Sequence, residues 1–137
     1  MKVAIIYAST TGNTEAMANA IKEAASSNAE VVFGTADSAN GAEVLACDVI
    51  LLGSPAMGDE VLEDSMEAFY AGIESGLSGK KVGLFGSYDW GDGQWLRDWE
   101  DRAKNAGASV TESLMVHLTP EADDITKCQE WTKAALA

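Results

Sequence analysis

Short apolar runs alternate along the whole chain with segments in which apolar residues recur at every third or fourth position. The apolar runs predict strands, at residues 3–7, 31–33, 49–52, 82–85 and 110–117. The periodic segments predict helices, at residues 14–26, 41–46, 62–77, 96–106 and 121–135. Five strands alternating with five helices predict a single α/β domain over residues 1–137, in which helices cover both faces of a parallel sheet.

The character of each strand indicates its place in the sheet. The first, third and fourth strands are apolar on both faces, as buried central strands must be. The second is short and the fifth carries Thr111 and Ser113, which suits edges. These features favour a doubly wound, five-stranded sheet in the order 2-1-3-4-5. Ligands of such sheets bind beyond the carboxyl ends of the strands, where the winding reverses. We therefore expect three loops to form a site, at residues 9–14 (first loop), 54–60 (second loop) and 87–93 (third loop).

The first loop has the composition of an anion site. It reads Ser9, Thr10, Thr11, Gly12, Asn13 and Thr14. Its hydroxyls and backbone N–H groups surround a helix N-terminus, which suits a bound phosphate. The loop holds no Lys or Arg, so a monophosphate held by neutral donors is expected. The alternative is a helix cap, because a Ser/Thr-rich entry followed by Glu15 is common at helix starts.

The other two loops offer flat or apolar surfaces. The second reads Ser54, Pro55, Ala56, Met57, Gly58, Asp59 and Glu60. Met57 can cover one face of a planar ring, and Gly58 is free to adopt a positive φ; the alternative is an ordinary turn. The third loop contains Ser87, Tyr88, Asp89, Trp90, Gly91 and Asp92. Trp90 can stack on a planar ligand, or it can pack on the helix that begins near Trp95.

The strongly acidic composition indicates which kinds of partner the protein can bind. The formal net charge is −13, which argues against nucleic acid and against an anionic membrane surface. Basic partners are expected, with solubility alone as the alternative. Cys47 and Cys128 form no CxxC pair, so we expect buried thiols in a reducing compartment, the cytoplasm. No apolar segment is long enough to predict a membrane span or a signal peptide.

Together the three loops resemble the FMN-binding loops of the flavodoxins, specifically the short clostridial type. The likeness is carried by residues 7–14, 52–65 and 84–95 and extends over essentially the whole chain. The fold it implies is flavodoxin-like, with FMN as the cofactor. Thr10 and Asp89 depart from the pattern, since close relatives often carry Gly at both places.

The resemblance implies a role for each loop residue. The phosphate would be bound by Ser9, Thr11, Asn13 and Thr14, with the backbone of Thr10 and Gly12. Pro55 and Ala56 would lie along the ribityl chain, and Met57 and Trp90 would sandwich the ring. The Asp59 N–H or the Gly58 carbonyl would face flavin N5, and Glu60 would bind N3–H. The ring and ribityl edge would be lined by Ser87, Tyr88 and Asp89, and we count Ser54, Gly91 and Asp92 with the same site.

The function so implied is that of a low-potential one-electron carrier rather than an enzyme. It would shuttle between semiquinone and hydroquinone as a monomer and serve redox partners with basic docking surfaces. The alternative is a flavodoxin-like FMN enzyme, such as a quinone reductase or a ribonucleotide-reductase activator.

Other classes and other residues are disfavoured. A phospho-signalling receiver domain needs an Asp at the end of the third strand and an acidic pair after the first strand. This chain has Gly53 and Ser54 at the first of these places and Ala8 and Ser9 at the second, so it lacks the acidic residues. A dinucleotide-binding oxidoreductase needs the motif G-x-G-x-x-G after the first strand, and this motif is absent. A tyrosine phosphatase needs a Cys and an Arg in its phosphate loop, and the first loop contains neither. We expect His117 to be structural, and Trp95, Trp99 and Trp131 to be packing residues.

Overall fold

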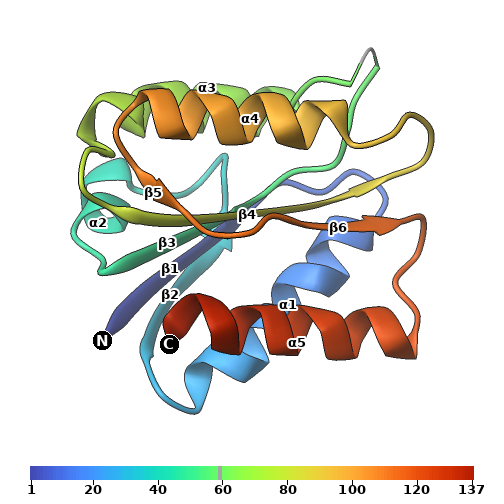
Figure 1. Ribbon diagram of the computed structural model, residues 1–137, viewed down its shortest axis with the longest axis horizontal. Coiled ribbons are helices and arrows are strands. Elements are labelled where there is room, and N and C mark those ends of the chain that lie inside the picture. The colour runs from blue at the N-terminus through green and yellow to red at the C-terminus, as the bar shows by residue number, and fades with distance from the viewer. Residues whose placement is uncertain (59) are drawn as a thin grey trace.

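A computed structural model describes residues 1–58 and 60–137 (Figure 1). Its strands are β1 (Lys2–Tyr7), β2 (Glu30–Thr35), β3 (Val49–Gly53), β4 (Lys81–Tyr88), β5 (Ser109–Val110) and β6 (Leu114–His117). Its helices are α1 (Asn13–Ser26), α2 (Gly41–Leu45), α3 (Asp64–Ile73), the 3-10 turn η1 (Glu74–Gly76), α4 (Gln94–Asn105) and α5 (Ala122–Leu136). All strand pairs in the sheet are parallel. The order β2-β1-β3-β4-β5 confirms the predicted sheet.

Helices lie on both faces of the sheet. In Figure 1, α3 and α4 cover one face, and α1 and α5 cover the other. The first core contains Met66, Tyr70 and Trp99, and the second contains Met17 and Phe85. Each fully buried apolar side chain of this size contributes roughly 1.5–3 kcal/mol relative to an exposed one. The two cores hold the sheet rigid, so the loops at its edge start from fixed positions.

The fifth strand differs from the prediction because it is interrupted. β5 and β6 both pair with β4, but residues 111–113 belong to neither. Between the pairs Val82↔Val110 and Phe85↔Leu114, β4 advances three residues and its partner advances four. The extra residue makes a bulge. Side chains from two helices contact it: Glu100 accepts a hydrogen bond from Ser113, and Trp131 donates one to the Glu112 carbonyl.

α3 also begins later than predicted. Leu62 is buried but lies outside the helix, which starts at Asp64 because Glu63 caps it. The Glu63 carboxylate accepts hydrogen bonds from the N–H groups of Ser65 and Met66, at 3.0 and 3.3 Å. Burial by itself would raise the pKa of Glu63, but these bonds and one from the Ser65 hydroxyl hold that pKa below its usual value. Glu63 is therefore a structural carboxylate.

Candidate functional site

The loops after β1, β3 and β4 enclose a cleft at the carboxyl edge of the sheet. Residues of all three loops line it, as the sequence predicts: Thr10, Thr11, Asn13, Pro55, Ala56, Ser87, Tyr88 and Asp89. Sequence patterning misses a ninth lining residue, Leu118, which follows β6. Its N–H donates to the Tyr88 carbonyl at 2.8 Å, and its φ is 63°. A fourth segment of the chain thus forms part of the wall.

In the first loop, Ser9 acts as a helix cap. Its hydroxyl oxygen accepts hydrogen bonds from the N–H groups of Gly12 and Glu15, at 3.1 and 3.3 Å. Gly12, with φ 92°, makes no side-chain cap of its own before α1 begins at Asn13. Ser9 therefore caps the helix, and its predicted contact with a phosphate stays a prediction.

Ser9 does not use all the donors of this loop. Within the part of the chain that the structure describes, four backbone N–H groups have no protein acceptor: those of Thr10, Thr11, Asn13 and Thr14. The Thr10 and Thr11 side chains are exposed. Unpaired N–H groups and the helix dipole together favour an anion at this place. The loop thus retains the donors of an anion site after its helix has been capped.

Thr14 and Ser87 form a buried contact between the first and third loops. Their hydroxyl oxygens lie 2.6 Å apart, and both residues are buried. The contact fixes the start of α1 against the end of β4. A contact of the Thr14 hydroxyl with phosphate stays a prediction, since this hydroxyl already has a protein partner.

The second loop folds back on itself. Met57 and Val61 exchange two backbone hydrogen bonds, of 2.9 and 3.0 Å, across a turn. Gly58 has φ 45°, which confirms its predicted positive φ, and Glu60 has φ 57°. Asp59 lies outside the described residues, so the predicted role of its N–H stays a prediction.

Ser54 begins the second loop as a fully hydrogen-bonded residue. Its N–H donates to the Phe85 carbonyl, and its hydroxyl donates to Pro55 O and accepts from Glu63 N–H. Its carbonyl accepts from the indole N–H of Trp95 at 3.2 Å. Ser54 is completely buried. It holds the loop in place, and direct contact with a ligand stays a prediction.

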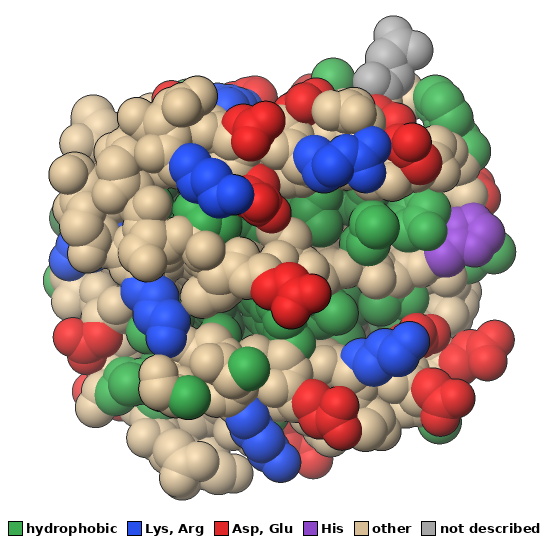
Figure 2. Space-filling view, viewed as in Figure 1, with side chains coloured by type: hydrophobic (Ala, Val, Ile, Leu, Met, Phe, Trp, Pro, Cys, Tyr) green, Lys and Arg blue, Asp and Glu red, His purple; other side chains and the backbone are tan. Residues whose placement is uncertain are grey.

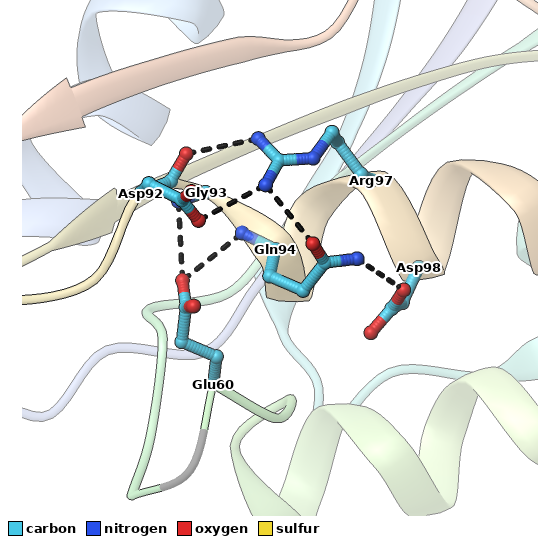
Figure 3. A network of polar contacts seen from close by, with 6 residues as sticks. All are labelled: Glu60, Asp92, Gly93, Gln94, Arg97 and Asp98. Carbon is cyan, nitrogen blue, oxygen red and sulfur yellow. Dashed lines mark hydrogen bonds and ion pairs between the residues drawn. The ribbon is translucent and has the colours of Figure 1, made fainter.

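Glu60 connects the second loop to the third (Figure 3). Its Oε1 accepts hydrogen bonds from the N–H groups of Gly93 and Gln94, at 3.1 and 3.0 Å. These groups lie at the start of α4, where a negative charge is stabilised by the helix dipole. Gly93 has no side chain with which to cap α4, so the cap comes from a residue distant in sequence. Arg97 adds hydrogen bonds to the carbonyl and carboxylate of Asp92.

Trp90 is exposed. Its exposed fraction is 61%, so the fold does not bury the indole against α4. Trp95 is buried in the core on that side, with 1% exposed. A large indole that the fold leaves in solvent, on a loop that lines the cleft, is available to a planar ligand.

His117 has the structural role expected of it. Its Nε2 lies 2.8 Å from the Asp89 carbonyl oxygen, to which an N–H at that atom donates. Its ring centre lies 4.9 Å from that of Tyr88. His117 therefore holds two lining residues of the third loop. Over residues 1–58 and 60–137, no group of His, Cys, Asp or Glu could hold a metal ion. No helix within these ranges has the length and apolarity needed to cross a membrane.

Comparison with known proteins gives one consistent result. The family model described as flavodoxin matches residues 5–131. The flavodoxin of Megasphaera elsdenii is 47% identical over 135 residues, which cover 97% of each chain. That of Clostridium beijerinckii is 48% identical over 120 residues, 85% of this chain and 87% of the relative. The solution structure of two-electron reduced M. elsdenii flavodoxin superposes with a TM-score of 0.88 at 45% identity and covers 98% of both chains.

Proposed function

The chain belongs to the flavodoxin family of FMN-binding electron carriers, and we propose that it holds FMN noncovalently in the cleft between its three loops. The observation that carries this proposal is the convergence of those loops on one cleft, with anion donors on one loop and the exposed Trp90 on another. When bound, FMN supplies the electron-transfer chemistry, and the protein's part is to bind and orient it.

The first loop fits the phosphate end of FMN. Its four unpaired backbone N–H groups and the exposed hydroxyls of Thr10 and Thr11 are neutral donors at a helix N-terminus. A phosphate there would gain charge-assisted hydrogen bonds, which are stronger than those between neutral groups. The Asn13 side chain adds an amide to the same wall of the cleft. We propose that these groups bind the phosphate.

The other two loops fit the ribityl chain and the ring. Pro55 and Ala56 line the middle of the cleft. Met57, half-buried, and Trp90, exposed, offer surfaces on the second and third loops for the two faces of the ring. Glu60 Oε1 caps α4, while its Oε2 has no partner among the described residues. We propose that Oε2 accepts the ring N3–H, so that one carboxylate both closes the site and binds the ring.

Selectivity for FMN over riboflavin tests this proposal directly. We expect Thr11→Ala to weaken FMN binding roughly ten- to hundredfold, since one hydrogen bond to a charged group is worth about 1.5–3 kcal/mol. Riboflavin binding should stay unchanged, because riboflavin has no phosphate. Fluorescence titration of the apoprotein with each flavin measures both constants. Ser26→Ala, at the other end of α1, is the control. Equal weakening of both flavins would mean that the loop serves only to cap the helix.

The surface around the cleft supports a docking role. Four exposed large apolar residues lie on the second and third loops or on the segments beside them: Val61, Trp90, Met115 and Leu118. Exposed carboxylates lie on the third loop, at the start of α3 and on the second turn of α4: Asp64, Asp89, Asp92 and Asp98. Figure 2 shows acidic side chains along the right-hand edge of the molecule, where β6 ends. We propose that basic redox proteins dock over this apolar centre and acidic rim.

Electrostatic docking predicts a salt dependence. The association rate with a basic cytochrome should fall steeply as salt rises, because the Debye length drops from ~10 Å at 0.1 M to ~3 Å at 1 M. Asp89→Asn should reduce the steepness, whereas Glu30→Gln, at the amino end of β2, should not. Stopped-flow mixing at several ionic strengths measures the rates. A salt-independent association rate would contradict electrostatic docking and would mean that the excess negative charge serves solubility alone.

We also propose that the protein works in the cytoplasm as a monomer. Cys47 and Cys128 are both free and buried, which suits a reducing compartment. Burial raises the pKa of Cys128 to about 11, with a further contribution from Asp124, so this thiol is unreactive at neutral pH.

A further inference from the structure

We propose that Trp95 positions the cofactor cleft, by holding the Ser54 carbonyl from beneath the second loop. The inference rests on the proposed function of the cleft. Its periodic position on α4 predicts only a packing role for Trp95, and the structure adds a specific polar contact to that packing. The contact joins α4, which lies outside the cleft, to the residue from which the second loop begins.

The contact is buried and directional. The Trp95 indole N–H donates to Ser54 O at 3.2 Å, and both residues are buried. Among the described residues, the indole N–H is the one donor that bonds to the Ser54 carbonyl, so its loss leaves that carbonyl without a protein partner. Pro55 and Ala56, which line the cleft, follow directly. Displacement of the Ser54 carbonyl would therefore move two lining residues.

Trp95 also supports the third loop. The ring centres of Trp95 and Tyr88, another lining residue, lie 5.7 Å apart. Gly86 lies at the same contact, where a Cβ would overlap the Ser54 carbonyl and lie 2.9 Å from Cζ2 of Trp95. Close packing of this kind transmits small shifts. The one indole thus supports two of the three loops.

Trp99 provides a matched comparison on the same helix. It lies one turn further along α4 and is equally buried, with 1% exposed. Its ring packs edge-on against Tyr70 with centres 5.8 Å apart. The Trp99 indole N–H has no partner among the described residues. Substitution by phenylalanine removes an N–H and shrinks a buried ring at both positions, but it removes a hydrogen bond only at Trp95.

The experiment compares Trp95→Phe with Trp99→Phe. We expect Trp95→Phe to raise the FMN dissociation constant about tenfold, equivalent to ~1.4 kcal/mol. Riboflavin should weaken by the same factor, because the phosphate donors are untouched, and Trp99→Phe should leave both constants unchanged. A merely structural role would lower stability in both variants without separating their flavin affinities, and that result would overturn the proposal.

A second measurement needs no flavin and separates this inference from the proposed function. The N–H groups of Ala56 and Met57 donate to Ser87 O and Val61 O, at 3.0 and 2.9 Å. Hydrogen exchange of these two amides, measured by NMR, should be faster in Trp95→Phe than in Trp99→Phe. Equal exchange would overturn the positioning role. Wild-type protein that binds no FMN would instead overturn the proposed function, while the exchange result would still decide the role of Trp95.

If Trp95→Phe does not fold, the wild-type protein supplies the test. On addition of FMN, the indole N–H signal of Trp95 should shift, because its acceptor precedes the residues that line the cleft. The Trp99 signal should stay in place. If the two indole N–H signals both shift by similar amounts, or if both stay in place, the proposal is overturned.

Discussion

Trp90→Ala should weaken FMN binding by about tenfold to a hundredfold, because stacking of an aromatic side chain on a base-like ring is worth about 1–3 kcal/mol. The same substitution should change the free energy of unfolding of the apoprotein by no more than about 0.5 kcal/mol, as for other exposed positions. The reason is that the Trp90 side chain is 61% exposed and contributes little to the core. Fluorescence titration and urea unfolding measure the two quantities.

Trp90→Phe and Met115→Ala are the controls for this prediction. Phenylalanine keeps a stacking face and should retain most of the affinity. Met115 is exposed on β6, outside the three loops, so its removal should leave FMN binding unchanged. An apoprotein that loses stability in Trp90→Ala, with unchanged FMN affinity, would show that Trp90 packs against the protein.

Gly58→Thr should lower the midpoint potential of the first one-electron step by several tens of millivolts. Gly58 has φ 45°, and a Cβ in left-handed geometry costs roughly 1–2 kcal/mol, with more for a β-branched residue. The resemblance implies that the peptide after Gly58 turns on reduction, so that the Gly58 carbonyl would face flavin N5–H. Strain that arises only in the turned form should penalise reduction. A one-electron couple shifts by about 59 mV for each tenfold change in equilibrium constant. Gly58→Ala should have a smaller effect in the same direction.

Gly79→Thr is the matched control for strain alone. Gly79 has φ 78°, and, like Gly58, has nothing within 4 Å of an added Cβ. It precedes β4, at the end of the sheet opposite the cleft. The threonine should therefore lower stability at both positions but shift the potential only at Gly58. A spectroelectrochemical titration that gives the wild-type first potential for Gly58→Thr would show that Gly58 serves only the turn.

Most of the fold follows from local sequence patterns. Strands that are apolar on both faces are expected to be central, and this pattern favours the strand order that the sheet adopts. The bulge in the fifth strand could not be predicted in this way. An extra residue in the register depends on contacts that are remote in sequence, such as Ser113 with Glu100 and Glu112 with Trp131. The helical period of the apolar residues predicts that α3 begins at Leu62, but the helix begins at Asp64 because the Glu63 side chain caps it.

The residues of the site also divide into those that the sequence predicts and those that only the tertiary structure reveals. Some site residues are of an unusual type for their position, and the sequence alone indicates them as ligand contacts. Examples are the hydroxyl residues of the first loop and Trp90, a large aromatic residue between Gly and Asp residues. Leu118 and Trp95 are apolar residues in ordinary patterns, so only the folded chain brings them to the cleft or beneath it. The resemblance predicts that Glu60 binds the ring, but its cap on the start of α4 depends on the tertiary structure.

Stepwise reduction of the FMN-reconstituted protein tests the central claim most directly. The apoprotein is loaded with one equivalent of FMN and titrated with electrons while its visible spectrum and potential are recorded. We predict two separate one-electron steps, with the second at the lower potential, since the exposed carboxylates around the cleft disfavour added negative charge. A single two-electron step, or a protein that retains no FMN, would contradict the assignment of this chain as a one-electron carrier.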